Sequence, residues 1–172
     1  MDEVIQFIQS FLSLEYEANI QSRSEPDTSL VETTLNNLNR FYRGLDPGIS
    51  LSSSRVLEDP ETVKTQFQPC VLFRIERYNH MTLGALYRIY LSSSLRGDES
   101  YFTNLFVANT DNGLKIISQY NLCNYCDGTG RRKSRICDEC HGMGWNWRGG
   151  QKLDLLGELV ETRQFTQPTR RV

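Results

Sequence analysis

The sequence predicts an α+β protein in which N-terminal helices precede an antiparallel sheet and a small cysteine-rich module follows. Apolar side chains recur at about the helical spacing of 3.6 residues in residues 1–42, and at the strand spacing of two in residues 70–120. Four of the five cysteines then fall within 18 residues. This order favours an α+β domain at residues 1–121, a module at 122–150 and a C-terminal segment at 151–172.

The composition excludes several classes of protein. The chain has 172 residues, of which 38% are hydrophobic and 23% charged, which is too apolar for a disordered chain and too polar for a membrane protein. The apolar runs are too short to span a bilayer, and the acidic start lacks the basic region of a secretory signal. We therefore expect a cytoplasmic protein, whose core needs no disulfides at this length.

Two main helices are predicted. The apolar residues of 1–23 share one helical face: Val4, Ile5, Ile8, Phe11, Leu12 and Ile20. Residues 24–27 break the pattern, and Asp27 or Ser29 can cap a second helix that carries apolar residues as far as Tyr42. Gly44 and a turn at 46–48 end this helix. Residues 59–66 are ambiguous and compatible with a short helical turn.

Four strands are predicted between residues 70 and 120. Cys70–Tyr78 is rich in β-branched and aromatic residues, and Leu83–Leu91 alternates apolar with polar positions. Tyr101–Ala108 and Leu114–Tyr120 are joined by a turn that contains an Asn-Gly hairpin signal. We expect an antiparallel meander with one solvated face. The charged residues expected on that face are Arg74, Glu76, Arg77 and Arg88.

The C-terminal segment is too apolar for a free tail. Its apolar residues are Leu153, Leu155, Leu156, Leu159 and Val160. We expect a short strand or helix that packs back on a neighbour, with disorder only from Gln167 onward.

The clustered cysteines form two CxxC pairs, Cys123–Cys126 and Cys137–Cys140, separated by ten residues. A tetrahedral zinc ion takes four thiolates at about 2.3 Å, and each pair supplies two from one tight turn. Glycines in each repeat can adopt the positive φ that such a turn requires. The spacing therefore predicts one structural Zn²⁺ ion.

Two other uses of these cysteines remain open. Two disulfides would need an oxidising compartment, and a redox dithiol of thioredoxin type normally carries a single CxxC. His141 adjoins the motif, but four thiolates already complete a zinc shell. Cys70 opens an apolar run and is expected to be a buried free thiol.

The repeated pattern CxxCxGxG, from Cys123 to Gly144, resembles half of the cysteine-rich region of DnaJ-type chaperones. The family carries four repeats and two zinc ions, whereas this chain has two repeats, enough for one. The His-Pro-Asp triplet of the J domain is missing. The resemblance therefore implies a zinc-held β-hairpin module that binds other polypeptides, without stimulation of a partner chaperone's ATPase.

The order of helices and strands in residues 1–121 resembles the NTF2-like (SnoaL-like) fold, in which a curved sheet wraps helices into a cone. A generic α+β sandwich is the alternative. Enzymes of the NTF2-like fold place an acid–base pair in the cone pocket. This sequence has two histidines, and His80 lies in a predicted turn. No catalytic triad, phosphate loop or HExxH motif is present, so we expect no catalysis.

Charge is distributed unevenly along the chain. Residues 123–152 carry six basic and three acidic groups, a net charge of +3, whereas residues 1–122 carry a net charge of −5. Arginine and tryptophan are common anchors of protein interfaces. The residues expected to contact a partner are Arg131, Arg132, Lys133, Arg135, Trp145 and Trp147.

These features favour a non-enzymatic protein-binding adaptor, of an immunity or assembly-chaperone type, whose zinc module contacts a protein partner. One alternative is a SnoaL-like enzyme or small-ligand binder that uses the cone pocket. The other is a protein that binds nucleic acid through the basic zinc module. A pocket plugged by Tyr87, Tyr90 and Phe106 would count against the enzyme. A homodimer is expected only by analogy with other NTF2-like domains, and no membrane partner is expected.

Overall fold

The computed structural model describes residues 1–24, 28–45, 59–66, 70–92 and 102–165. The helices are α1 (Asp2–Ser24), α2 (Thr28–Asn39) and α3 (Pro60–Gln66). The long strands are β1 (Val71–His80), β2 (Gly84–Ser92), β3 (Phe102–Thr110) and β4 (Gly113–Leu122), and later strands are β5 (Arg131–Arg132), β6 (Arg135–Ile136), β7 (Trp145–Gly150) and β8 (Glu158–Gln164). The predicted α+β class is confirmed.

One antiparallel sheet of six strands, in the order β7-β4-β3-β2-β1-β8, organises the described part of the chain. The four predicted strands are its central members. The predicted hairpin turn is also present: Thr110 pairs with Gly113, whose φ of 82° suits glycine. The predicted packing of the C-terminal segment is confirmed as a strand, β8, on β1. Residues from Gln167 onward lie outside the described residues.

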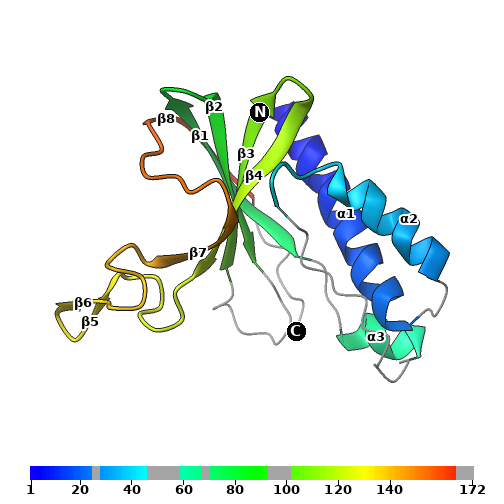
Figure 1. Cartoon of the computed structure of the whole chain (residues 1–172). Coiled ribbons are helices and arrows are strands. Elements are labelled where there is room, and N and C mark those ends of the chain that lie inside the picture. Colours follow the sequence, from blue (N-terminus) through cyan, green and yellow to red (C-terminus); the bar gives the residue numbers. More distant parts are fainter. Residues whose placement is uncertain (25–27, 46–58, 67–69, 93–101, 166–172) are drawn as a thin grey trace.

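Helices α1 and α2 lie on one face of the sheet, and α3 packs at the end of α1 (Figure 1). Ile8 and Phe11 of α1 and Leu38 of α2 are almost completely buried against apolar side chains of the sheet. The hydroxyl of Thr34 donates a 2.7 Å hydrogen bond to the Gln21 side-chain oxygen, which joins α2 to α1. Within the described residues, no helix has the length and apolarity needed to cross a membrane.

The second helix ends earlier than its apolar pattern predicts. It stops at Asn39, and Tyr42 instead forms an isolated parallel bridge to Ile116 of β4. The rings of Phe41 and Tyr42 lie 5.8 Å and 5.6 Å from the ring of Phe11. Packing against α1 therefore draws these residues out of the helical path. The predicted turn at 46–48 lies outside the described residues.

The second face of the sheet is covered, and the prediction of a solvated face is wrong. Glu76 is only 8% exposed, and its Oε2 atom accepts hydrogen bonds from the hydroxyls of Tyr78 (2.6 Å) and Tyr90 (2.7 Å). The segment 151–157, which links β7 to β8, places Leu153 and Leu156 on this side. The sequence pattern could not show this cover, because it comes from residues far along the chain.

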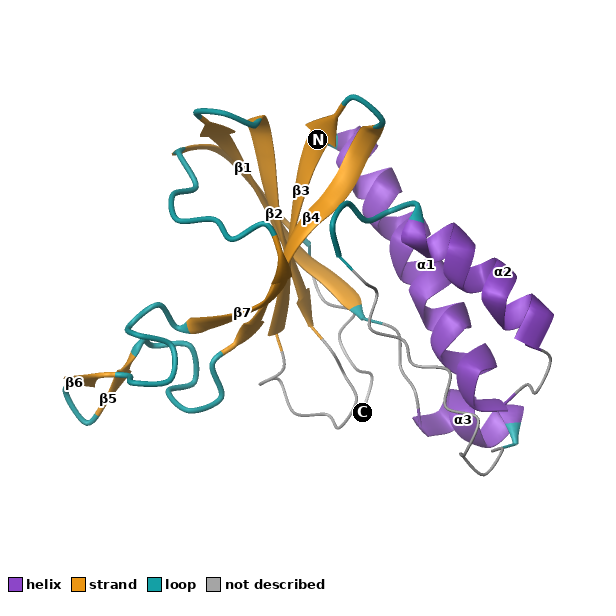
Figure 2. Ribbon diagram, in the orientation of Figure 1, coloured by secondary structure: helices purple, strands orange, loops and turns teal. Residues whose placement is uncertain are grey.

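The cysteine-rich module is inserted between two paired strands of the sheet. Leu122 of β4 pairs directly with Trp145 of β7, and the module occupies the residues between them. It projects from the sheet far from the helices (Figure 2). The predicted division at residue 121 therefore differs from the structure, because β7 and β8 belong to the same sheet as β1–β4.

Candidate metal centre

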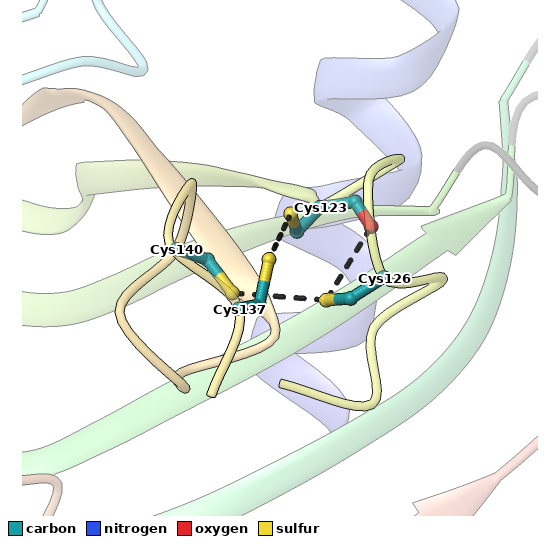
Figure 3. A group of neighbouring side chains, drawn as sticks. All are labelled: Cys123, Cys126, Cys137 and Cys140. Atoms are coloured by element: carbon teal, nitrogen blue, oxygen red, sulfur yellow. Dashed lines mark hydrogen bonds between the residues drawn. The ribbon is translucent and has the colours of Figure 1, made fainter. Parts of the chain in front are cut away.

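The two CxxC pairs meet at one point, as the spacing predicts. The Sγ atoms of Cys123, Cys126, Cys137 and Cys140 all lie within 4.8 Å of one another, and all four residues are buried (Figure 3). Two of the sulfur–sulfur distances are 3.9 Å (Cys123–Cys137) and 3.7 Å (Cys126–Cys140). A tetrahedral ion with metal–sulfur bonds of about 2.3 Å has edges of about 3.8 Å. The sulfurs therefore fit a four-coordinate metal.

The same distances do not fit disulfides. A disulfide joins sulfurs at about 2.05 Å, and all five cysteines are free thiols in the structure. Cys70, predicted to be a buried thiol, is half-buried. Desolvation by burial, with the nearby Glu15 carboxylate as the second cause, raises the pKa of Cys70 to about 12. This thiol is therefore unreactive at neutral pH.

Each CxxCxGxG repeat folds into a tight turn, here called a knuckle: the first is Cys123–Gly130 and the second is Cys137–Gly144. The two knuckles are built from the same backbone hydrogen bonds. The N–H of Gly128 donates to the Cys123 carbonyl, and the N–H of Gly142 donates to the Cys137 carbonyl, both at 3.2 Å. The N–H of Gly130 donates to Cys126 Sγ at 3.3 Å. The N–H of the matching Gly144 donates to Cys140 Sγ at 3.1 Å. Such amides stabilise a thiolate, because they bring partial positive charge to the sulfur.

The two knuckles also clasp each other by reciprocal bonds. The N–H of Cys123 donates to the Gly144 carbonyl and the N–H of Cys137 to the Gly130 carbonyl, both at 2.9 Å. Gly130 and Gly144 have φ of 70° and 76°. A Cβ at Gly130 would overlap the carbonyl oxygen of Gly142, and a Cβ at Gly144 that of Gly128. These two glycines are therefore required by both conformation and space.

The pKa values of Cys126 and Cys140 are shifted in opposite directions. Desolvation by burial raises the pKa of both Cys126 and Cys140, and the Gly130 and Gly144 amides oppose it. At Cys126 the amide and the neighbouring thiols prevail, and its pKa is lowered to about 7. At Cys140 the neighbouring thiols raise the pKa further, to about 11. Four adjacent thiolates therefore need a cation among them, and acid opposes metal binding.

The basic residues predicted to contact a partner lie at the tip of the module. Arg131, Arg132, Lys133 and Arg135 are exposed, in or beside the small β5–β6 hairpin. The guanidinium of Arg132 stacks 4.3 Å from the ring centroid of Tyr125. His141 is exposed and stands outside the cysteine group. Its φ of 50° matches that of Asp127 in the first knuckle, so it holds a turn position.

The two predicted tryptophans have different environments. Trp147 is 46% exposed, as a contact residue should be. Trp145 instead packs on the covered face of the sheet. Its ring lies edge-on to the Tyr90 ring, with 6.2 Å between the centroids, and the Arg88 guanidinium lies 5.1 Å from the Trp145 ring. Trp145 therefore has a packing role in the sheet, and its contact with a partner stays a prediction.

The sequence pattern did not predict three exposed apolar side chains of the module, those of Tyr125, Ile136 and Met143. Tyr125 (55%), Ile136 (63%) and Met143 (55%) are exposed on the module together with Trp147. Tyr125 and Met143 occupy x positions of the CxxCxGxG repeats, Ile136 precedes the second repeat, and Trp147 lies in β7. Leu122, which precedes the first knuckle, packs over Gly128; Ile136, at the matching place before the second knuckle, lies over Gly142 and is left uncovered.

Other ionisable groups lie away from the module. Glu15 of α1 has a pKa raised to about 7, because burial removes water from its carboxylate. His80 ends β1, and its Nδ1 atom accepts hydrogen bonds from the N–H groups of Thr82 and Leu83, both at 3.2 Å. The sequence predicts His80 in the turn itself, whereas the structure places it at the end of β1, where it stabilises the turn that follows.

Tyr87, Tyr90 and Phe106, whose plugging of a pocket would count against an enzyme, do not share one face of the sheet. Tyr87 packs against the helix-side core, whereas Tyr90 and Phe106 lie under the segment that covers the opposite face. Comparison of this chain with protein-family models, with curated proteins and with solved structures gives no match.

Proposed function

We propose that the four cysteines hold one structural zinc ion. The tetrahedral sulfur spacing, the complete burial of the cluster and the two amides directed at sulfur support a closed four-thiolate site. Zinc is favoured because it accepts four thiolates without redox chemistry and leaves no position open for substrate. The ion would stabilise residues 123–144, a segment that has no apolar core of its own.

We infer that the zinc module docks a protein partner. The observation that carries this function is the coincidence of exposed apolar and basic side chains on one small unit. Tyr125, Ile136, Met143 and Trp147 are about half exposed, and the β5–β6 hairpin adds four cationic groups. Aromatic, methionine and arginine side chains are enriched at interfaces. A partner with an acidic surface around apolar residues fits this module.

The rest of the molecule fits a non-enzymatic adaptor. We propose that the helices and the sheet form an NTF2-like (SnoaL-like) body, since α1 and α2 lie against one face of an antiparallel sheet. On this proposal the body positions the module, and the module makes the contact. This division of roles between body and module fits two kinds of adaptor. One is an immunity protein that neutralises a toxin, and the other is an assembly chaperone without a J domain.

The experiment is affinity capture from the native host with the full chain and two charge-introducing variants. Ile136→Glu places a carboxylate on the module surface, and Met81→Glu does so at a remote turn where Met81 is 95% exposed. Wild type and Met81→Glu should capture the same polypeptides, and Ile136→Glu should lose at least one while retaining its metal. Equal capture by all three chains would contradict the proposed docking surface.

Nucleic-acid binding is the second candidate. The stacking of Arg132 on Tyr125 and the exposed Trp147 provide a cation and aromatic faces of the kind that contact single strands. A salt-dependent gel shift that disappears in an Arg131→Ala, Arg132→Ala, Lys133→Ala variant would favour it. The net charge of +3 on residues 123–152 is small for this role.

A further inference from the structure

A second group of exposed apolar side chains lies outside the zinc module. Leu155 is 75% exposed, Leu159 50% and Val160 48%. The last two belong to β8, in which all seven residues are exposed. Among the described strands, β8 is the last of its sheet and has β1 as its one neighbour. An edge strand of this kind offers unpaired backbone groups to another strand.

The backbone groups at the free edge can be assigned from the register. Arg163 of β8 pairs with Ile75 of β1, and the N–H of Phe165 donates to the Phe73 carbonyl at 2.9 Å. Hydrogen-bonded and non-hydrogen-bonded residues alternate along an antiparallel pair. The N–H and C=O groups of Phe165 and Arg163 therefore point to β1, and those of Thr162 and Gln164 point away from it.

The free edge carries few of the features that block strand addition. Residues 158–164 contain no proline and no lysine. The only irregularity between β1 and β8 falls between Arg77 and Tyr78, beside Val160. Residues 161–164 therefore remain in regular register, with outward amides at two positions.

The charge order of this edge is complementary to itself. Two antiparallel copies of β8 centred on Thr162 would place Glu161 opposite the partner's Arg163, and Arg163 opposite the partner's Glu161. Opposite charges at directly paired positions stabilise an antiparallel pair. Arg163 already bonds Asp2 through one terminal nitrogen, Nη1, at 2.6 Å and is 48% exposed. Its other donors remain available to a second carboxylate.

We propose that β8 pairs with β8 of a second copy of this chain, antiparallel about Thr162, and joins two sheets into one. This interface lies at the edge of the sheet, apart from the zinc module, and covers the half-exposed Leu159 and Val160. It is independent of the proposed zinc function, because its residues neither ligate the cluster nor lie on the module.

The test is sedimentation velocity of the full chain over a range of concentrations up to about 1 mM. Wild type should show a concentration-dependent dimer. Glu161→Arg places like charges opposite each other at two sites and should raise the dimer dissociation constant about tenfold. The double variant Glu161→Arg, Arg163→Glu should restore wild-type affinity, because the charge order is complementary again.

A second pair of variants tests the backbone. Thr162→Pro removes an outward N–H that β1 does not use and should abolish the dimer, whereas Thr162→Val keeps the N–H and should retain it. Circular dichroism checks that both chains fold. If Thr162→Pro fails to fold, the comparison of Glu161→Arg with the double variant Glu161→Arg, Arg163→Glu still tests the proposed dimer. A monomer at every concentration, or a dimer that neither Glu161→Arg nor Thr162→Pro weakens, would overturn the proposal.

Discussion

Gly130 and Gly144 show how single residues determine whether the module can form. Each has a positive φ, donates its N–H to a cysteine sulfur, and leaves no space for a Cβ beside the other knuckle. The glycines of the CxxCxGxG pattern are therefore as necessary to the metal centre as the cysteines. Their role follows from the contact between two knuckles, which neither repeat could form alone.

The first prediction compares glycines that share a conformation but differ in surroundings. Gly130→Ala should lower metal affinity more than about tenfold, because the new methyl overlaps the Gly142 carbonyl. Gly84→Ala meets no atom within 4 Å at a similar φ of 68°. It should cost only about 1 kcal/mol of the free energy of unfolding and leave the metal bound. Competition with a chromogenic chelator measures both, and equal affinities would count against the two-knuckle clasp.

Glu15 provides a second prediction, on pH and stability. Burial raises its pKa from 4.5 to about 7 in the folded chain. The folded state therefore binds more protons than the unfolded state between these values, and the free energy of unfolding falls as pH rises from about 4.5 to about 7. Glu15→Gln removes this dependence and should stabilise the protein at pH 8 by on the order of 2 kcal/mol, but not at pH 4.

The control for Glu15 is Glu32→Gln, which changes an exposed carboxylate on α2. Urea unfolding of the three chains at several pH values gives the comparison. A stability difference between wild type and Glu15→Gln that does not grow from pH 4 to pH 8 would show that this carboxyl is not desolvated.

At the scale of elements, the module is a long hairpin connection between β4 and β7. Leu122 and Trp145 are paired across the sheet, so the residues between them leave and return at one place. The sheet does not use the side chains of residues 123–144 in its core, which is formed by residues of the helices, the long strands and the segment 145–157. The module can therefore differ in stability from the sheet that carries it.

This arrangement predicts that the module can be removed. Replacement of residues 123–144 by Asn-Gly should close a two-residue hairpin between Leu122 and Trp145 and leave the body folded. The shortened chain should bind no metal and should lose the captured partner. Far-UV circular dichroism and a cooperative urea transition check the body. If the shortened chain loses both the far-UV signal and the cooperative transition, the module contributes to the fold of the sheet.

Local features of the sequence predicted much of this architecture, and long-range contacts account for the rest. The four central strands and the cysteine cluster follow from alternation and spacing within short segments. The early end of α2 depends on rings of α1, and the burial of Glu76 depends on a segment some 80 residues later. The packing of Trp145 on Tyr90 could not be predicted for the same reason, because it brings together residues that no local pattern relates.

At the scale of the whole molecule, charge and exposed apolar side chains are unevenly distributed. Residues 123–152 carry a net charge of +3, and residues 1–122 carry −5. Exposed apolar residues occur on the module and along the β7–β8 region. One surface is proposed for a protein partner and the other for a second copy, and the sheet keeps them apart.

Native mass spectrometry of the full chain tests the zinc centre most directly. The account predicts one zinc ion per chain, at a mass lowered by the protons that the cysteine thiols release on binding the metal. The ion should be lost when Cys123→Ser or Cys137→Ser removes a ligand. Acidification should release the ion as the thiolates take up protons. A metal-free chain lighter by the hydrogens of two disulfides, or a chain with four free thiols and no ion, would contradict it.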